Sequence, residues 1–498
     1  MKLPKQAGNK LSFTYEIRTD LTWENGEPVT INDLMFTFKA NCCELVNNHH
    51  VKFLLENIDS LECINSKQFK IKFKKEHFLN FVLSYSLPVL QKSKMDSTSI
   101  LDEFSLPELQ NTLKIKSQTE KYTKLLQWAN EFNSEKYGTV IRNLNGGGEF
   151  YVESWERNVQ LTLKRKKKKI NDKNEKNLAE KIILVVNKDP LSQLLLIKNQ
   201  KIDLSSSLDT KTLVELIKDK KFRKNYNFAF VETLGYTYLG FNCKAGSDKK
   251  IFNDLETRKA ISHLLPYALL NKISYFNKNS RAKGPVSEFK KEFYQGLLVP
   301  EQDRKKALEF LKKGGWKAGK KNILEKKIKD KTIPFQFELA YYNSSPVWQE
   351  IALLIKNELK KSKIEVSLVC LSPSNLQANL QEHKFDAYLG AKTESMLPED
   401  FYLFWHSEQW KNNGTNYTGF GNPFSDSLID CIQKCTDENE RIKTSGLIQK
   451  IITEELPVVF LFKSMRRMVL HKRWGGQYFF HEKPFINSNE LYLIHHDN

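Results

Sequence analysis

The residues best suited to chemistry lie between Phe385 and Phe424, where one carboxylate, Glu394, follows a short apolar stretch. That apolar stretch is predicted to be a strand, and Pro398 is predicted to begin a helix rich in aromatic residues, followed by a Gly- and Asn-containing loop. A single carboxylate at a strand end, among amide and aromatic side chains, suits the binding of an extended polar ligand. The stretch therefore predicts a binding protein rather than an enzyme.

The rest of the sequence offers no alternative catalytic group. No Ser/His/Asp, Cys/His or paired-carboxylate spacing typical of an active site recurs, and Glu399 and Asp400 are interpreted as acids at a helix start. The seven cysteines are irregularly spaced and form neither a disulfide framework nor a paired CxxC zinc signature. We expect no enzymatic activity and no cofactor.

Two features could still bind a metal. Cys431 and Cys435 are four residues apart on a predicted helix and could share a face, although such residues are more often small half-buried side chains. The histidine pairs His49-His50 and His495-His496 have no acid cluster beside them. We expect no metal site.

Composition sets the class of protein. The 498 residues, 40% hydrophobic and 12% aromatic, are enough for two or three cores, and no run approaches the roughly eighteen apolar residues of a membrane helix. Lys and Arg total 78 against 59 Asp and Glu, a net charge of +19 that would favour anionic membranes or nucleic acid. The densest run, Lys164 to Lys169, is interpreted as a solvated strand end or loop.

Local patterns predict several elements. Alternation predicts strands at residues 10–18 and 78–90, and paired strands between Tyr151 and Leu163. Thr30 or Asn32 is predicted to cap a helix, and the pair Gly314-Gly315 to end one. The glycine triplet 146–148 could cradle a phosphate, but the alternation after it favours a turn between strands.

The first of these helices carries a recognisable motif. The pattern W-x-[DN]-G-x-P-V-T-x-x-D-[LV]-x-F-[ST]-[FW] resembles the signature of the family 5 extracellular solute-binding proteins, the peptide receptors of ABC importers. The matching residues are Trp23, Asn25, Gly26, Pro28, Val29, Thr30, Asp33, Phe36 and Phe38. Further segments resemble the family in the same order along nearly the whole chain: 146–155, 200–204, 251–262, 303–316, 416–430 and 438–462. Where the family has a glycine between a helix and a strand, this sequence has Lys363, so the turn is expected to be built differently.

The resemblance implies a periplasmic-binding-protein-like α/β fold, with two lobes joined by a hinge and an extra small subdomain. By motif order, residues 1–138 form the subdomain, residues 139–235 with 466–498 the first lobe, and residues 236–465 the second lobe. The family's usual N-terminal strand region precedes the W-x-[DN]-G motif, and because the motif begins at Trp23 this region is expected to be lacking from the sequence. Either an N-terminal piece is omitted or the gene is truncated, and truncation would put ligand binding in doubt.

The resemblance also implies a function. A monomer outside the cytoplasmic membrane or in the periplasm, with the lipoprotein anchor that the family implies, is expected to capture a peptide or related solute and deliver it to the permease subunits of an ABC transporter. No signal peptide is visible, and nucleic acid is not expected as a partner. The alternatives are a basic protein at anionic membranes or nucleic acid, and a truncated relative that binds poorly.

Glu394 aligns with the family's aspartate that pairs with the α-amino group of a peptide. The alternative is that Glu394 is a solvated acid on a loop. The other residues expected to contact the ligand are Gly390, Lys392, Thr393, Trp405, Asn416 and Tyr417.

Overall fold

The computed structural model describes residues 11–47, 55, 57–84, 88–112, 119–166, 178–187, 189–244, 251–319, 322–328, 330–343, 345–411, 414–476 and 478–494. These residues belong to two compact units, 1–188 and 189–498. Met1, both histidine pairs and Lys167 to Lys169 lie outside the described residues. The division into a subdomain and two lobes stays a prediction.

The first unit begins with an antiparallel three-stranded sheet in the order β1-β3-β2. Its strands are β1 (Ser12–Glu16), β2 (Ile58–Cys63) and β3 (Gln68–Phe73), so the strand predicted at residues 10–18 is confirmed. Helix α1 (Ile31–Cys42) begins after Thr30, as predicted, and the Thr30 backbone N–H donates to Asp33 Oδ2 at 2.8 Å. Phe38 of α1 packs on the sheet with Tyr15 and Ile71, which makes the N-terminal family motif part of a core.

The other face of α1 builds a second core with the helices that follow, through Phe36, Leu101, Phe104 and Trp128. These helices are α4 (Lys92–Met95), α5 (Leu106–Gln110) and α6 (Thr119–Phe132), whereas Phe81 of α3 (Asn80–Leu83) lies against Phe13 of β1. The strand predicted at residues 78–90 is wrong, because its first part forms α3. Buried Asn80 donates to Lys75 O and accepts from Asn57 Nδ2, and these local polar contacts hold a turn where alternation alone favoured a strand.

The first unit ends in an antiparallel meander of β4 (Phe150–Glu156), β5 (Gln160–Arg165) and β6 (Lys181–Val185). The paired strands predicted between Tyr151 and Leu163 are therefore confirmed. Lys164 and Arg165 end β5 and pair with Glu153 and Glu149, which agrees with the interpretation of this part of the basic run as a strand end.

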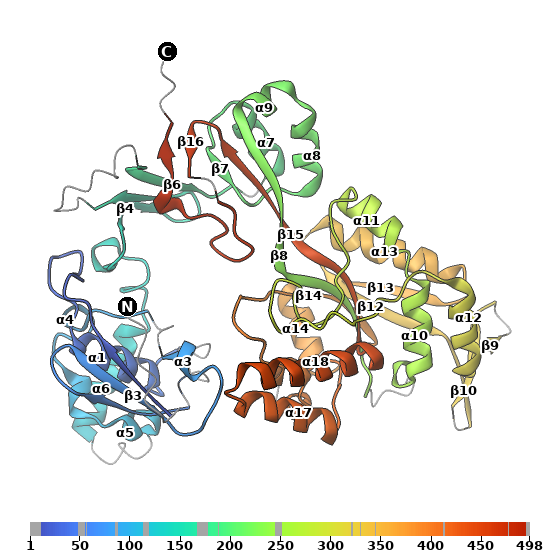
Figure 1. Cartoon of the computed structure of the whole chain (residues 1–498), viewed down its shortest axis with the longest axis horizontal. Helices are drawn as coiled ribbons and strands as arrows, with labels where there is room; N and C mark the ends of the chain where they lie inside the picture. Colours follow the sequence, from blue (N-terminus) through green and yellow to red (C-terminus); the bar gives the residue numbers. More distant parts are fainter. Residues whose placement is uncertain are drawn as a thin grey trace. The chain divides into compact units, whose positions relative to one another are not determined.

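The second unit is built on a six-stranded mixed sheet in the order β13-β12-β14-β8-β15-β7 (Figure 1). Its strands are β7 (Leu204–Ser205), β8 (Tyr226–Phe241), β12 (Gln336–Tyr342), β13 (Glu365–Leu371), β14 (Ala387–Lys392) and β15 (Val458–His471). Strands β13, β12 and β14 are parallel, whereas β8 runs antiparallel to both β14 and β15. The long pair β8 and β15 therefore joins two parts of the unit.

Helices cover this sheet at both ends of the long strand pair (Figure 1). Near β7 lie α7 (Pro190–Lys198), α8 (Thr210–Lys218) and α9 (Lys220–Asn225). Toward β12 and β13 lie α10 (Leu255–Leu264), α11 (Tyr267–Tyr275), α12 (Arg304–Lys313), α13 (Pro346–Lys360) and α14 (Pro373–Gln381). The largest core fills this second region, with Leu239, Phe337, Ile355 and Leu389 all at most 1% exposed.

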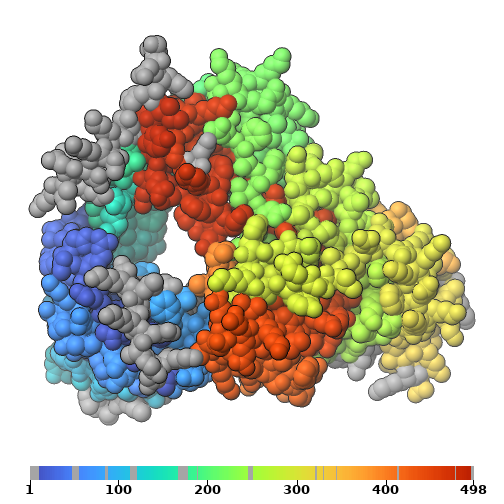
Figure 2. Space-filling model, viewed as in Figure 1, coloured from blue at the N-terminus to red at the C-terminus, as the bar shows by residue number. Residues whose placement is uncertain are grey.

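The remaining elements are short helices, a late helix pair and two small sheets. They are α15 (Tyr402–Trp405), α16 (Glu408–Lys411), α17 (Pro423–Lys434), α18 (Glu438–Glu455), β9 (Lys317–Ala318), β10 (Leu324–Ile328), β11 (Lys331–Pro334), β16 (Trp474–Gly475) and β17 (Tyr492–Leu493). Figure 2 shows residues 285–300, yellow-green to yellow, lying against orange-red α18 on this face. There Gln449 Nε2 donates to Glu292 O at 2.6 Å and fixes the segment before α12.

Two turns test the expectations about glycine. Gly315, at φ +81°, ends α12 as predicted. Lys363 also adopts the left-handed conformation, at φ 61°, so the expectation of a differently built turn is wrong. The turn keeps the geometry that favours glycine and tolerates the strain of a side chain. Within the described ranges, no helix is both long and apolar enough to cross a bilayer.

Candidate functional site

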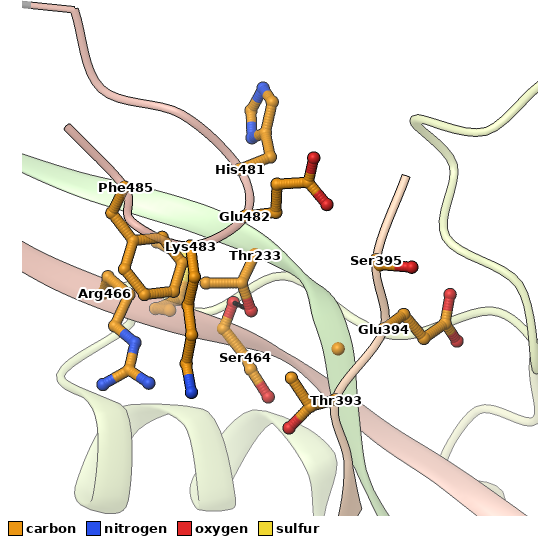
Figure 3. A pocket seen from close by; sticks show the side chains of 12 residues that line it. Thr233, Thr393, Glu394, Ser395, Ser464, Arg466, His481, Glu482, Lys483 and Phe485 are labelled. Atoms are coloured by element: carbon orange, nitrogen blue, oxygen red, sulfur yellow. Dashed lines mark hydrogen bonds between the residues drawn. The ribbon is translucent and has the colours of Figure 1, made fainter. Parts of the chain in front are cut away.

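A pocket of about 400 Å³ opens in the second unit where β8, β14 and β15 meet the C-terminal segment (Figure 3). Its lining comes from four stretches of chain that are distant in sequence. They are Thr233 and Gly235; Thr393, Glu394 and Ser395; Ser464, Met465 and Arg466; and His481, Glu482, Lys483 and Phe485. Eight of these twelve residues carry a hydroxyl group or a charged side chain, which can orient a ligand that has polar groups.

A glycine allows β8 and β14 to approach closely at this pocket. A Cβ added to Gly235 would lie 2.4 Å from Lys392 O and 3.1 Å from Thr393 Cα, both of them backbone atoms. Backbone atoms cannot rotate away, so any larger residue would separate the strands that carry Thr393 and Glu394. Gly390 of β14 also allows the two strands to approach closely. A Cβ added to Gly390 would lie 2.6 Å from the ring of Tyr238, its partner on β8.

The third strand is irregular at the pocket. The pairing of β15 with β8 shifts between Phe460 and Lys463 and again between Lys463 and Met465. Within this bulge the Thr233 hydroxyl donates to Ser464 O at 3.1 Å, which compensates for regular ladder bonds. Bulges redirect side chains, and here the bulge precedes Arg466.

Beside the pocket, four buried charges form a set that we call the Glu394 network: Glu394, Glu399, Lys290 and Lys392. Lys290 Nζ lies 3.2 Å from Glu394 Oε2 and 3.2 Å from Glu399 Oε2, and Lys392 Nζ also pairs with Glu399. Side-chain exposures are 1% for Glu394, 2% for Lys290, 9% for Glu399 and 14% for Lys392. Two carboxylates and two ammonium groups thus balance each other away from water.

The two carboxylate oxygens of Glu394 differ in their hydrogen bonding. Glu394 Oε2 also accepts from Ser287 N at 3.4 Å, whereas Oε1 has no hydrogen-bond partner among the described residues and lies 4.0 Å from Lys392 Nζ. The buried hydroxyl of Tyr236 likewise lacks a partner in that part of the chain, and its pKa is raised by burial and then by Glu394. Unpartnered buried polar atoms are uncommon and point to a ligand or solvent contact.

Burial and neighbouring charges move the proton affinities of the network in opposite directions. Burial raises the pKa of Glu394 to about 7, and the Glu399 carboxylate adds to this rise while the two lysines oppose it. Burial acts on Glu399 too, but Lys392 and Lys290 outweigh it and hold the pKa of Glu399 below its usual range. Burial also opposes the charge of Lys290, yet Glu399 and Glu394 raise the pKa of Lys290. Glu394 is therefore the group that titrates near neutral pH.

The C-terminal segment supplies the opposite side of the pocket. His481 Nδ1 lies 2.8 Å from Glu232 O, and its ring stacks on Phe289. Glu482 accepts a hydrogen bond from Met396 N at 2.8 Å. These contacts fix the segment that carries Lys483 over the strands.

Comparison with known proteins identifies the family. Residues 2–414 match the family model of the bacterial extracellular solute-binding proteins, family 5 Middle. The chain belongs to this family. The oligopeptide-binding protein AppA of Bacillus subtilis (strain 168) is 24% identical over 499 residues, which cover 98% of this chain and 82% of AppA.

Solved structures agree on the fold. The structure of AppA from Bacillus subtilis in complex with a nonapeptide matches 99% of this chain and 89% of its own, with a TM-score of 0.73 and 21% identity. NikA from Brucella suis in complex with Fe(III)-EDTA matches 99% and 91%, with a TM-score of 0.77 and 18% identity. The periplasmic-binding-protein-like α/β fold expected for this solute-binding protein is confirmed.

The residues predicted to bind ligand divide into two groups. Glu394 and Thr393 line the pocket, and Lys392 and Gly390 lie just before them on β14. Trp405, Asn416 and Tyr417 do not line this pocket and are buried elsewhere in the unit. Asn416 Nδ2 donates to His406 O and Phe420 O, and the Tyr417 hydroxyl accepts from Gln377 Nε2. The role of all seven in binding stays a prediction.

The helix predicted to begin at Pro398 is wrong. Residues 398–401 are irregular, and α15 begins only at Tyr402 and ends at Trp405. Glu399, expected at a helix start, turns inward to Lys290 and Lys392, and Asp400 Oδ1 accepts from Tyr402 N. The ion pairs thus replace a first helical turn.

Four charged residues of the site were missed. They are Lys290, Arg466, Glu482 and Lys483, which lie in segments that show no motif, and only the contacts made by folding bring them to Glu394 and the pocket. Within the described residues, no group of histidine, cysteine and acidic side chains is placed to hold a metal.

Proposed function

We propose that this family 5 protein captures a peptide, or a related small organic solute, in the pocket beside Glu394 and delivers it to the permease of an ABC importer. The observation that carries the proposal is Glu394 Oε1, a buried acceptor at the pocket with no hydrogen-bond partner in the described part of the chain. A ligand N–H group would satisfy this oxygen and recover free energy lost on burial. AppA, crystallised with a nonapeptide, favours peptides, and NikA, crystallised with Fe(III)-EDTA, keeps other solutes open.

The α-amino group of a peptide is the donor that we assign to Glu394. The position is already partly neutralised, because Lys290 lies 3.2 Å from the other carboxylate oxygen. A ligand ammonium would therefore share Glu394 with Lys290 rather than meet a free carboxylate. The shared pair would still be worth more than an exposed one, since both partners lie away from water.

Isothermal titration calorimetry with pools of short peptides tests the proposal. We expect Glu394→Gln to weaken binding of peptides with a free N-terminus at least about tenfold, about 1.4 kcal/mol. N-acetylated peptides should bind the parent protein poorly. Glu438→Gln is the matched control, because Glu438 pairs with Lys291 at the surface of the same unit. Equal affinity for free and acetylated peptides, unchanged by Glu394→Gln, would remove Glu394 from the site, and no binding to any pool would overturn the function.

The remaining parts of the proposal follow the family. The protein would act as a monomer outside the cytoplasmic membrane or in the periplasm, releasing its ligand unchanged. The comparisons support solute binding and not the alternative of a basic protein at anionic membranes or nucleic acid. Trp405, Asn416 and Tyr417 would then act indirectly, by supporting the core behind β14.

A further inference from the structure

A short turn at residues 287–290 supplies two of the contacts that Glu394 makes. Ser287 N donates to Glu394 Oε2 at 3.4 Å, and Lys290 Nζ lies 3.2 Å from the same oxygen. The turn is closed by a hydrogen bond from Lys290 N to Ser287 O at 3.0 Å. Both donors therefore keep their positions at the carboxylate only while the turn as a whole is held in place.

Lys463 of β15 holds this turn. Its ammonium nitrogen lies 2.6 Å from Glu288 Oε2, inside the turn, and 3.1 Å from Glu232 Oε2 on β8. The same nitrogen lies 5.8 Å from the ring centroid of Phe289, the next residue of the turn. The Lys463 side chain is 13% exposed, and although burial opposes its charge, Glu288 and Glu232 raise its pKa. This lysine is therefore a charged link between the turn and the long strand pair.

The chain that leads into the turn is tied to the same point of β15. Lys463 N donates to Ser280 O at 2.9 Å, and Asn279 Nδ2 donates to Lys463 O at 2.9 Å. Lys283 also pairs with Glu288, but it belongs to the same segment as the turn and does not tie the turn to the sheet. Lys463 thus connects the turn to the sheet through both its side chain and its backbone.

We propose that Lys463 is a positioning residue of the ligand site, which acts on Glu394 through the turn that it holds. By anchoring Glu288, it keeps the two donors of the turn against the Glu394 carboxylate. Lys463 does not line the pocket of about 400 Å³, so it acts without touching a ligand there. The inference rests on the proposed function and deepens it, because a ligand ammonium pairs with an ionised carboxylate.

The groups around Glu394 set the direction of the effect. Burial and Glu399 favour the neutral form of Glu394, whereas Lys392 and Lys290 favour its ionised form. The nearby Tyr236 is uncharged, because burial raises its pKa well above the ordinary value. In Figure 3 the carboxylate of Glu394 points away from the ionisable side chains across the pocket, which are Arg466, His481, Glu482 and Lys483. Loosening the turn should therefore move the titration of Glu394 to higher pH.

Carbon-13 NMR of the ligand-free full chain, labelled at glutamate, measures this titration, and Glu394→Gln assigns the signal. We expect Lys463→Met to move the midpoint upward by about one pH unit, because an opposite charge a few ångströms away shifts a carboxyl by about that much or more. Glu288→Gln, which removes the other partner of the ion pair, should move the midpoint in the same direction. Lys463→Arg should keep the midpoint of the parent protein, since it keeps the charge.

Calorimetry with peptides that have a free N-terminus gives a second readout. The pKa of Glu394 is about 7, so a rise of one unit lowers its ionised fraction about fivefold at pH 7, about tenfold at pH 6 and very little at pH 9. The affinity of Lys463→Met relative to the parent protein should follow these ratios. The amino group of the peptide titrates with a pKa of about 8, but it does so equally for both proteins and cancels in the ratio.

The control and the outcomes separate positioning from a structural role. Lys291→Gln is the matched control, because Lys291 follows the turn and pairs with Glu438 at the surface, and it should move neither readout. An unchanged titration of Glu394 in folded Lys463→Met and Glu288→Gln would overturn the inference, and so would a loss of affinity that is equal at every pH. If Lys463→Met melts too low to measure, Glu288→Gln alone decides. A shifted titration in a parent protein that binds no peptide would remove the proposed function and leave the positioning of Glu394 intact.

Discussion

Charged side chains lie on both sides of the pocket, but they are buried and ion-paired on one side and more exposed and unpaired on the other. On one side, Lys290 and Glu394 are 2% and 1% exposed and lie 3.2 Å apart. On the other, Arg466 is half-buried and Lys483 exposed, with no ion pair to a described residue. A buried, paired charge stabilises one arrangement and is costly to disturb, whereas an unpaired charge at the pocket remains available to a ligand. The first side is therefore expected to contribute chiefly to stability, and the second side has charge available for a ligand.

The largest loss of stability is expected from removing one charge of the Glu394 network. Glu399→Gln leaves Lys290 and Lys392 with Glu394 as their only carboxylate, so one buried positive charge loses its partner. We expect the free energy of unfolding to fall by about 3–5 kcal/mol. Chemical denaturation followed by circular dichroism measures the change.

Glu438→Gln is again the matched control. Glu438 pairs with Lys291 at side-chain exposures of 52% and 76%, so its loss should cost less than about 1 kcal/mol. Arg466→Gln should likewise cost little stability, because its charge has no protein partner to strand. A loss for Arg466→Gln as large as for Glu399→Gln would contradict the division between the two sides.

The next largest effect is expected at Gly235, where β8 and β14 approach closely beside the pocket. Gly235→Ala places a Cβ 2.4 Å from Lys392 O, so β8 and β14 must separate. We expect a loss of about 1–3 kcal/mol in stability, with weaker ligand binding because Thr393 and Glu394 move together. Gly147→Ala, where an added Cβ meets no atom within 4 Å, should stay within about 0.5 kcal/mol. Normal binding by Gly235→Ala would show that the close approach of the strands does not shape the pocket.

A smaller effect should appear with pH. The pKa of Glu394 is about 7 in the folded protein and 4.5 ordinarily, so the folded state holds this proton more tightly than the unfolded chain does. The stability from the neutral carboxyl is therefore complete below pH 4.5 and is lost as the pH rises through 7. We expect the stability of the parent protein, relative to Glu394→Gln, to fall by about 3 kcal/mol between pH 4.5 and pH 8.

Thermal melts of both proteins across this range measure that difference. Lys483→Gln should change the pH dependence very little, because Lys483 lies on the unpaired side of the pocket and outside the network. A relative stability of Glu394→Gln that is constant with pH would mean that Glu394 stays ionised throughout.

Short-range features of the site were predictable from sequence. Glu394 could be placed after a strand because the apolar stretch before it is continuous, and β14 indeed ends at Lys392. Thr30 and Gly315 were predictable for the same reason, since a cap depends on residues within a turn of it. Lys363 shows the limit of such rules, because the tertiary fold holds a lysine in a conformation that glycine would adopt at lower cost.

Long-range features were not predictable. Lys290 lies 109 positions before Glu399, and no local pattern marks either as a partner of the other. The failed helix at Pro398 has the same cause, because the ion pairs of Glu399 outweigh a local helix signal. Arg466 and Arg467 look equivalent in sequence, yet the bulge in β15 turns only Arg466 toward the pocket, while Arg467 Nε donates to Leu208 O.

The alternation of side chains along β15 places one pocket residue and two core residues on the same face of the strand. Arg466, Met468 and Leu470 alternate along one face of the strand, and the last two are fully buried in a cluster with Phe485. Because side chains on a strand alternate with a period of two, deleting one residue from the irregular segment 461–464 would turn all three to the opposite face. Within this segment Leu461 and Phe462 are buried in the main core, so their side chains are constrained as well. A change of its length by one would in addition turn Arg466 away from the pocket and Met468 and Leu470 out of their cluster.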